Sequence, residues 1–153
     1  HLLTLETDPK TVKILEENCR INNVNPKIVN AALSKKTLYQ KDWDCIPSDI
    51  SLIDKGYFKV NTITYDELKK DFGIPDTLVA DCEGALFYIF QDFPEILDDV
   101  QMIIMENDFP TIENKLFVNK LLTDKGFKCI YSKRIDGWHV SPCKEFFYET
   151  WKK

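Results

Sequence analysis

Several features that would assign a function directly are absent from this sequence. No apolar run approaches the roughly 20 residues that a membrane-spanning helix needs, and no charged-then-apolar leader marks a signal peptide. Neither a G-x-S-x-G nucleophile elbow nor a local Cys–His signature is found, so hydrolase chemistry is not supported. Glycine is scarce, with five residues, and the first of them is Gly56. No Gly-rich nucleotide loop therefore lies within the first 55 positions.

Cysteine is used in a way that predicts neither a metal site nor a disulfide framework. The five cysteines are Cys19, Cys45, Cys82, Cys129 and Cys143. Their number is odd, and no C-x-x-C pair exists, so a zinc site or a redox dithiol has little support. We interpret them as small, buried apolar residues in a cytoplasmic, disulfide-free protein.

Composition and charge are those of an ordinary globular domain. Of the 153 residues, 44% are hydrophobic and 29% are charged, which favours one folded domain. Lys and Arg number 20 against 25 Asp and Glu, giving a net charge of -5. Because affinity for phosphates rests on Lys and Arg, nucleic acid is not an expected partner.

Apolar segments and helix signals alternate along the chain. Asp8 and Pro9 suit the N-cap and first position of a helix that ends at Asn22. Pro94 is expected to break or kink the helix predicted over 84–97. The other helices are predicted over 66–72 and 111–125, and strands over 2–5, 27–33, 58–64, 77–82, 101–105, 127–132 and 145–151. This order predicts an α/β fold with a mostly parallel sheet, whose last two strands are antiparallel neighbours.

Acidic side chains follow three of the predicted strands: Glu6, then Asp81 with Glu83, then Glu106 with Asp108. Ligands of open parallel sheets bind beyond the carboxyl ends of the strands. Residues 6 and 81 are therefore expected to face one ligand crevice.

Each of these acids has more than one interpretation. Glu6 suits a bidentate hydrogen bond to the two hydroxyls of a ribose, or it simply begins a surface turn. Asp81 is suited to accept a hydrogen bond from a cofactor ammonium or to orient a substrate hydroxyl. Glu83 suits the N-terminus of a helix, where an acid stabilises the dipole. Glu106 and Asp108 offer oxygen donors for Mg²⁺, but such clusters are more often solvated loops, and no metal is predicted.

Two further groups of side chains have a functional and a structural interpretation. His139, in a turn after Gly137 and Trp138, is a candidate general base because imidazole titrates near neutral pH. Four aromatic residues are interpreted as the core-facing side of a helix rather than as a stacking platform: Phe87, Tyr88, Phe90 and Phe93.

Five stretches, in order, resemble the FkbM-type methyltransferases. They are LETDP with its following helix and NAALS, then VNTITYDEL, LVADCEGA, VQMIIMEND and LLTDKGFK. The resemblance runs from about Leu3 to Phe127. It departs from the family at Val79, where Lys is frequent, at Leu86, where a second acid is frequent, and at Asn107-Asp108, which replaces an E-x-H pattern.

The resemblance implies a Rossmann-like class I fold that binds S-adenosyl-L-methionine. It implies that Glu6 binds the cofactor ribose, that Asn30 and Ala31 lie beside the adenine, and that Asp81 faces the methionine end and the acceptor hydroxyl. Residues 1–153 would form a single methyltransferase-like domain.

The family's first strand and its D-x-G-A-x-x-G loop have no counterpart here. In the family's strand order, 3-2-1-4-5-7-6, that strand lies between the Glu6 and Asp81 strands. We therefore expect the chain to be an N-terminally incomplete fragment that is inactive alone, with a strand and a Gly-rich loop preceding His1.

The leading hypothesis is an S-adenosylmethionine-dependent O-methyltransferase acting on a hydroxyl of a sugar, glycan or other small molecule. Asp81 is the first candidate for the base and His139 the second. The alternative is a non-catalytic methyltransferase-like domain that binds a nucleoside or a protein partner. A nicotinamide-dependent dehydrogenase also uses a strand-end acid, but it leaves LVADCEGA unexplained and lacks its G-x-G-x-x-G fingerprint here.

Overall fold

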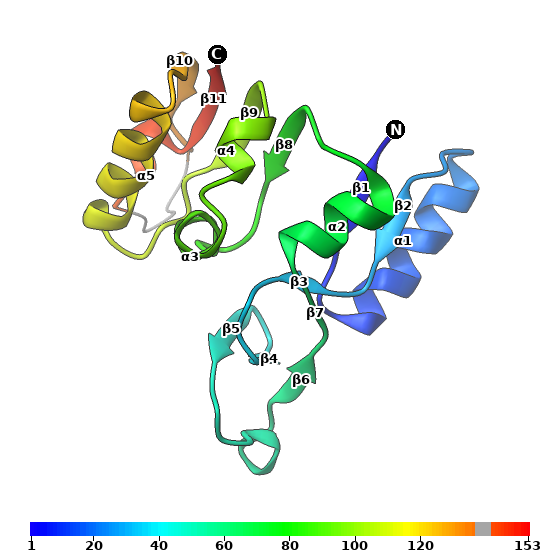
Figure 1. Cartoon of the computed structure of the whole chain (residues 1–153). Helices are drawn as coiled ribbons and strands as arrows, with labels where there is room; N and C mark the ends of the chain where they lie inside the picture. The colour runs from blue at the N-terminus through cyan, green and yellow to red at the C-terminus, as the bar shows by residue number, and fades with distance from the viewer. Residues whose placement is uncertain (137–141) are drawn as a thin grey trace. The chain divides into compact units, whose positions relative to one another are not determined.

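The fold was analysed in a computed structural model, which describes residues 1–136 and 142–153. The chain divides into two compact units, His1–Gly73 and Ile74–Lys153 (Figure 1). Each unit combines helices with small sheets, which confirms the α/β class. The expectation of a single domain over residues 1–153 stays a prediction.

The first unit begins with a β-α-β segment. Its elements are β1 (Leu3–Leu5), α1 (Pro9–Ile21) and β2 (Lys27–Val29). The strands β1 and β2 are parallel, with Leu5 opposite Val29. Asp8 caps α1 by accepting a hydrogen bond from the Lys10 amide at 2.7 Å, and Pro9 occupies the first turn. The predicted start of this helix is therefore confirmed.

The remainder of the first unit consists of short strands and one helix. Its elements are β3 (Ala32–Leu33), β4 (Leu38–Lys41), β5 (Asp44–Pro47), η1 (Ile53–Lys55), β6 (Phe58–Val60), β7 (Thr62–Ile63) and α2 (Tyr65–Phe72). β4 pairs antiparallel with both β5 and β6, whereas β3 and β7 form a separate parallel pair. Thr64 and Glu67 cap α2 reciprocally, so this helix begins where Thr64 ends the strand pattern.

Two of the predicted strands are each divided in the structure. The segment 27–33 forms β2 and β3, and the segment 58–64 forms β6 and β7. The break in the first follows from a tight bend, in which the Ala31 amide donates to the Val29 carbonyl at 2.9 Å. β3 then pairs with β7 instead of continuing along β1, so one apolar run serves two sheets.

The second unit is a four-stranded sheet with helices. Its elements are β8 (Thr77–Ala80), α3 (Leu86–Asp92), α4 (Ile96–Asp99), β9 (Met102–Glu106), α5 (Ile112–Asp124), β10 (Lys128–Lys133), η2 (Lys144–Phe146) and β11 (Tyr148–Lys152). The strand order is β10-β11-β9-β8. β8 and β9 are parallel, whereas β11 is antiparallel to both of its neighbours. The predicted antiparallel pairing of the last two strands is confirmed.

The mostly parallel sheet is only partly confirmed. Across the described residues the strands form four small sheets, in which parallel and antiparallel pairs are mixed. The expected helix over 84–97 is divided into α3 and α4 around Phe93 and Pro94, as the proline predicts.

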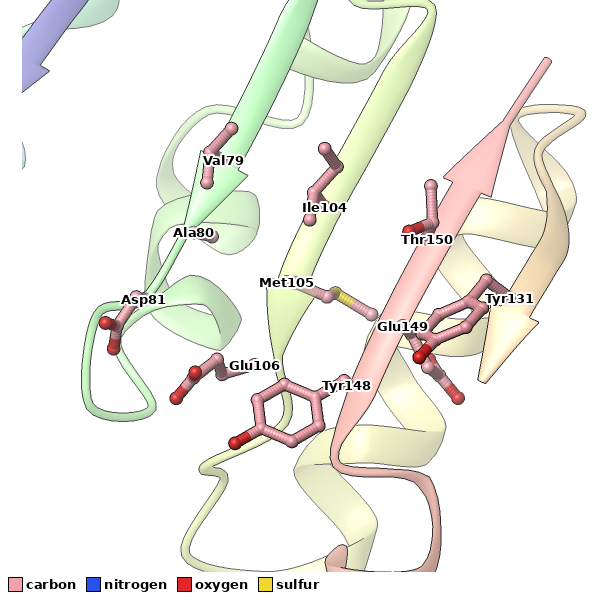
Figure 2. Close-up of a pocket in the computed structure, with 10 residues that line it drawn as sticks. All are labelled: Val79, Ala80, Asp81, Ile104, Met105, Glu106, Tyr131, Tyr148, Glu149 and Thr150. Carbon is pink, nitrogen blue, oxygen red and sulfur yellow. The ribbon is translucent and has the colours of Figure 1, made fainter. Parts of the chain in front are cut away.

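The core of the second unit lies on the face of its sheet that the helices cover. Ile103 and Met105 of β9 point into it and are buried, whereas the intervening Ile104 is 40% exposed. Figure 2 shows the helices behind the sheet, with Val79, Ile104 and Thr150 on the opposite, open face. Phe90 and Phe93 join the core, but Tyr88 is 51% exposed, so the expectation of a core aromatic cluster holds for only part of that set.

The cysteines differ in burial. All five are free thiols, and Cys143 is fully buried. Cys45 and Cys129 are exposed, contrary to the expectation that all would be buried, and every residue of the strands that carry them, β5 and β10, is exposed. Within residues 1–136 and 142–153, none of the helices has the length and apolar character required to cross a bilayer.

Candidate functional site

In the first unit, Glu6 and Asn30 meet at the carboxyl ends of the parallel strands β1 and β2. The Glu6 amide donates to the Val29 carbonyl at 3.1 Å, extending the parallel ladder by one residue. The side-chain amide of Asn30 donates to the carbonyls of Glu6 and Thr7, at 2.8 and 3.0 Å. These bonds hold the two strand ends together, so Asn30 has a clear positioning role that the sequence did not predict.

The carboxylate of Glu6 is held in a fixed orientation. Its Oε1 atom accepts a hydrogen bond from the Asp8 amide at 2.8 Å, and the residue is half-buried. Asp8 is also the N-cap of α1, so the residue that orients the Glu6 carboxylate is the one at which the helix begins. Because a carboxylate has about four lone-pair positions, it can accept further hydrogen bonds from a ligand in this orientation. Ala31, the third predicted cofactor contact, lies next to Asn30 and is buried.

In the second unit, Asp81 and Glu106 lie at the carboxyl ends of β8 and β9. Ala80 and Met105 are opposite each other in the parallel register, so the next residues of the two strands are neighbours. Figure 2 shows both carboxylates at this edge of the sheet. They line a hollow of about 300 Å³ on the open face, the lining residues being Val79, Ala80, Asp81, Ile104, Met105, Glu106, Tyr131, Tyr148, Glu149 and Thr150.

The open face carries two rows of side chains across the strands. Val79, Ile104, Thr150 and Tyr131 are successive cross-strand partners and form the floor of the hollow. In the next row, Tyr148 is opposite Glu106 on one side and Lys133 on the other. Side chains directly opposite each other on one face of a sheet are close enough to contact each other. The polar row therefore brings carboxylate, phenol and ammonium groups to one edge.

Tyr148 is the principal residue of this hollow that sequence reasoning missed. The strand over 145–151 and its antiparallel neighbour over 127–132 are predicted from the sequence, but the pairing with β9 that places Tyr148 beside Glu106 is not. The alternation of Tyr148, Thr150 and Lys152 with buried Glu149 and Trp151 is visible in the sequence, and it marks the open face only once β11 is known to lie between β9 and β10.

The turn after β8 packs closely against the turn after β9. Glu83 and Gly84 both have left-handed backbone conformations, with φ angles of 50° and 79°. A Cβ atom on Gly84 would lie 3.2 Å from both the Asp108 carbonyl oxygen and the Pro110 Cδ atom. Glycine therefore allows the two turns to approach.

Glu83 does not cap the helix that follows it. The N-cap of α3 is Ala85, which provides no side-chain hydrogen bond, and no acidic residue occupies the first helical turn. The left-handed turn at Glu83 and Gly84 delays the helix by two residues, which moves Glu83 away from the cap position. The predicted capping role is therefore wrong.

Burial controls the ionisation of two groups beside this turn. It raises the pKa of Asp108, an effect that the Gly84 amide partly offsets and that the nearby Asp81 charge reinforces. Burial, with the neighbouring charge of Asp108 second, raises the pKa of the Cys82 thiol to about 12. Asp81 itself is exposed at the edge of the sheet.

A buried ion pair lies on the helix side of the same sheet. Lys115 of α5 donates hydrogen bonds to Glu149 of β11 and to Asn119, the latter at 2.6 Å. Glu149 also accepts from the indole N–H of Trp151 at 2.8 Å. In the same helix Leu116 is 59% exposed, whereas the charged Lys115 occupies a buried position.

Two further predictions concern His139 and metal binding. His139 lies outside the described residues. Within the described parts of the chain, no group of three or more His, Cys, Asp or Glu side chains is arranged to hold a metal ion. Glu106, Asp108 and Asp81 therefore do not form such a group.

Comparison with known proteins finds likeness in structure but not in sequence. No family model matches the chain, and no curated protein matches it. Among solved structures, the fold is similar to that of a precorrin-6y C5,15-methyltransferase from Geobacter metallireducens GS-15. The TM-score is 0.52 at 14% identity, and the match covers 100% of this chain and 68% of that one. At this identity the likeness concerns the fold.

Proposed function

We propose that this chain is part of an FkbM-type, S-adenosylmethionine-dependent O-methyltransferase with a class I sheet. The observation that carries the proposal is the strand order of the second unit, β8-β9-β11-β10, with β11 antiparallel. It corresponds to 4-5-7-6 in the class I order, and the parallel pair β1–β2 corresponds to strands 2 and 3. The fold shared with a methyltransferase supports the same assignment.

The residues at the end of β1 fit the cofactor that this proposal requires. Glu6 presents a carboxylate whose orientation is fixed by the Asp8 amide, and a carboxylate is the group that best accepts two ribose hydroxyls. The Asn30 side chain bonds to the Glu6 and Thr7 carbonyls and so joins the ends of β1 and β2. These bonds fix the position of Glu6 relative to Asn30 and Ala31. In the proposal, Glu6 binds the ribose, and Asn30 and Ala31 lie beside the adenine.

Asp81 is proposed to act on the acceptor hydroxyl. When bound, S-adenosylmethionine supplies an electrophilic methyl group on a sulfonium. Asp81 would orient the acceptor hydroxyl and take its proton, leaving an acceptor oxygen able to receive that methyl group. General base assistance of this kind is worth typically about 10²–10⁴-fold in rate. A small-molecule or glycan hydroxyl is the proposed acceptor, and the cytoplasm the proposed location.

Calorimetry with the full-length protein tests the cofactor assignment. Glu6→Ala should abolish S-adenosylmethionine binding, whereas Glu6→Gln retains an acceptor for the Asp8 amide and should bind more weakly than the wild type. Glu16→Ala, which alters an exposed acid on α1, is the matched control. Unchanged affinity in Glu6→Ala would contradict the assignment.

Activity is tested by incubating the full-length protein with labelled S-adenosylmethionine and candidate glycans. A 14-Da gain in acceptor mass is expected. Asp81→Asn should lower that rate about 100-fold or more while retaining cofactor binding. Cofactor binding without methyl transfer to any acceptor would favour a non-catalytic domain instead.

A further inference from the structure

We propose that the Tyr148 hydroxyl binds the acceptor and that Tyr148 is a specificity-determining residue of the hollow on the open sheet face. The inference rests on the proposed function, because it names the residue that holds the molecule to be methylated. No motif singled out Tyr148, and its position follows from the pairing of β11 with β9 and β10.

Tyr148 lies in the polar row of the hollow. Tyr148 of β11 is directly opposite Glu106 of β9. Asp81 follows β8, the strand on the other side of β9. Figure 2 shows its ring at the carboxyl edge of the sheet, with the hydroxyl on the same side as the carboxylates of Asp81 and Glu106. A molecule placed for proton removal by Asp81 therefore lies along the row of side chains that runs through Glu106 and Tyr148.

The side chains of the polar row differ in the hydrogen bonds that they can make. Asp81 and Glu106 accept hydrogen bonds when ionised, whereas a phenol both donates and accepts. Tyr148 thus supplies, beside two acceptor-only carboxylates, a neutral donor to a ring or hydroxyl oxygen of the bound molecule. The row also contains the ammonium of Lys133, opposite Tyr148, but its two carboxylates outnumber that one cation, so the row disfavours anionic groups. The expected acceptor is a neutral polyhydroxyl compound, and phosphorylated forms should bind less well.

The floor of the hollow is largely apolar and aromatic. Val79 is 66% exposed, Ile104 is 40% exposed and Tyr131 is 51% exposed, so an apolar and aromatic surface lies next to the polar row. A pyranose has this combination of hydroxyl edges and an apolar C–H face. The arrangement therefore favours a neutral sugar over a small, fully polar alcohol.

The test uses full-length protein and a panel of neutral methyl glycosides with their phosphorylated counterparts. Binding is measured by saturation-transfer NMR and titration. At least one neutral glycoside should bind, and Tyr148→Phe should weaken it about threefold to tenfold, the loss expected for one hydrogen bond between neutral groups. Tyr88→Phe, which changes a tyrosine of α3 that does not line the hollow, should bind as the wild type does.

The outcomes separate this inference from the proposed function. S-adenosylmethionine binding should be the same in Tyr148→Phe and wild type, and their thermal unfolding midpoints should agree. Equal glycoside affinity in Tyr148→Phe and wild type would overturn the inference, as would failure of every glycoside to bind a protein that binds the cofactor. Loss of the cofactor assignment alone, with Tyr148-dependent glycoside binding retained, would overturn only the proposed function.

Discussion

Lys115 donates a hydrogen bond to Glu149, and the two side chains are only 1% and 6% exposed. The pair joins α5 to β11, the strand whose opposite face carries Tyr148 and Thr150. Burial lowers the pKa of Lys115, while the Glu149 carboxylate opposes that effect. An ion pair in this environment depends on both partners, because either one alone is an uncompensated buried charge.

Replacing Lys115 by Met should therefore destabilise the protein strongly. The expected loss is about 3–5 kcal/mol in the free energy of unfolding, measured by urea denaturation. Lys120→Met removes an exposed pair with Asp124 on the same helix and should cost less than about 1 kcal/mol. The double variant Lys115→Met, Glu149→Met should recover part of the loss, though the Trp151 indole then lacks its acceptor. Equal losses in Lys115→Met and Lys120→Met would contradict this account.

Replacing Gly84 by Ala should cost more than the same change at another left-handed glycine. At Gly84 the added Cβ meets the Asp108 carbonyl and Pro110 at 3.2 Å, whereas at Gly126 it meets nothing within 4 Å. Both positions have φ angles near 80°, so Gly126→Ala measures the backbone cost, roughly 1–2 kcal/mol. Denaturant unfolding of the two variants gives the additional steric cost. Similar values at the two sites would mean that the turns after β8 and β9 do not approach closely.

Replacing Asp108 by Asn should change how stability depends on pH. The folded-state pKa of Asp108 lies above 3.8, so the folded protein binds this proton more tightly than the unfolded chain does. Its contribution to stability is present below pH 3.8 and is lost as the pH rises through the folded-state pKa. Asp108→Asn should therefore have its greatest advantage in Tm near pH 7, and that advantage should vanish below pH 3.8. Asp71→Asn, at an exposed position, should show no such trend.

Cys82 should resist alkylation in the folded protein. With a pKa of about 12, only about one thiol in 10⁴ is a thiolate at pH 8. Iodoacetamide should modify the exposed Cys45 and Cys129 first, as followed by peptide mass spectrometry. In urea, Cys82 should react at the rate of the other cysteines. Rapid modification of Cys82 without denaturant would show that its environment is more open than described.

Local signals in the sequence predicted the parts of the fold that local chemistry controls. Asp8 and Pro9 start α1, and Pro94 separates α3 from α4, because a cap and a missing amide act within one turn. The last two strands are predicted to be antiparallel neighbours because Gly137 and Pro142 lie in the segment that joins them, and the structure confirms that pairing.

Features that depend on distant residues could not be predicted in the same way. Asn30 bonds to carbonyls 24 and 23 positions earlier, which ends β2 where the apolar pattern continues. Lys115 is buried because Glu149, 34 positions later, meets it, and a helical pattern alone places charged residues outside. The sequence identifies Glu6, Asp81 and Glu106 as candidate site residues because each follows a predicted strand. Tyr148 becomes a candidate only when β11 is known to pair with β9.

The position of β11 also constrains how the second unit folds during synthesis. This strand lies between β9 and β10, both of which precede it in the sequence. While the chain is synthesised, β9 and β10 have no common partner until β11 has left the ribosome, so their edges remain open to other strands during that interval. Chaperone dependence and early aggregation of nascent chains are therefore expected to end only when β11 emerges.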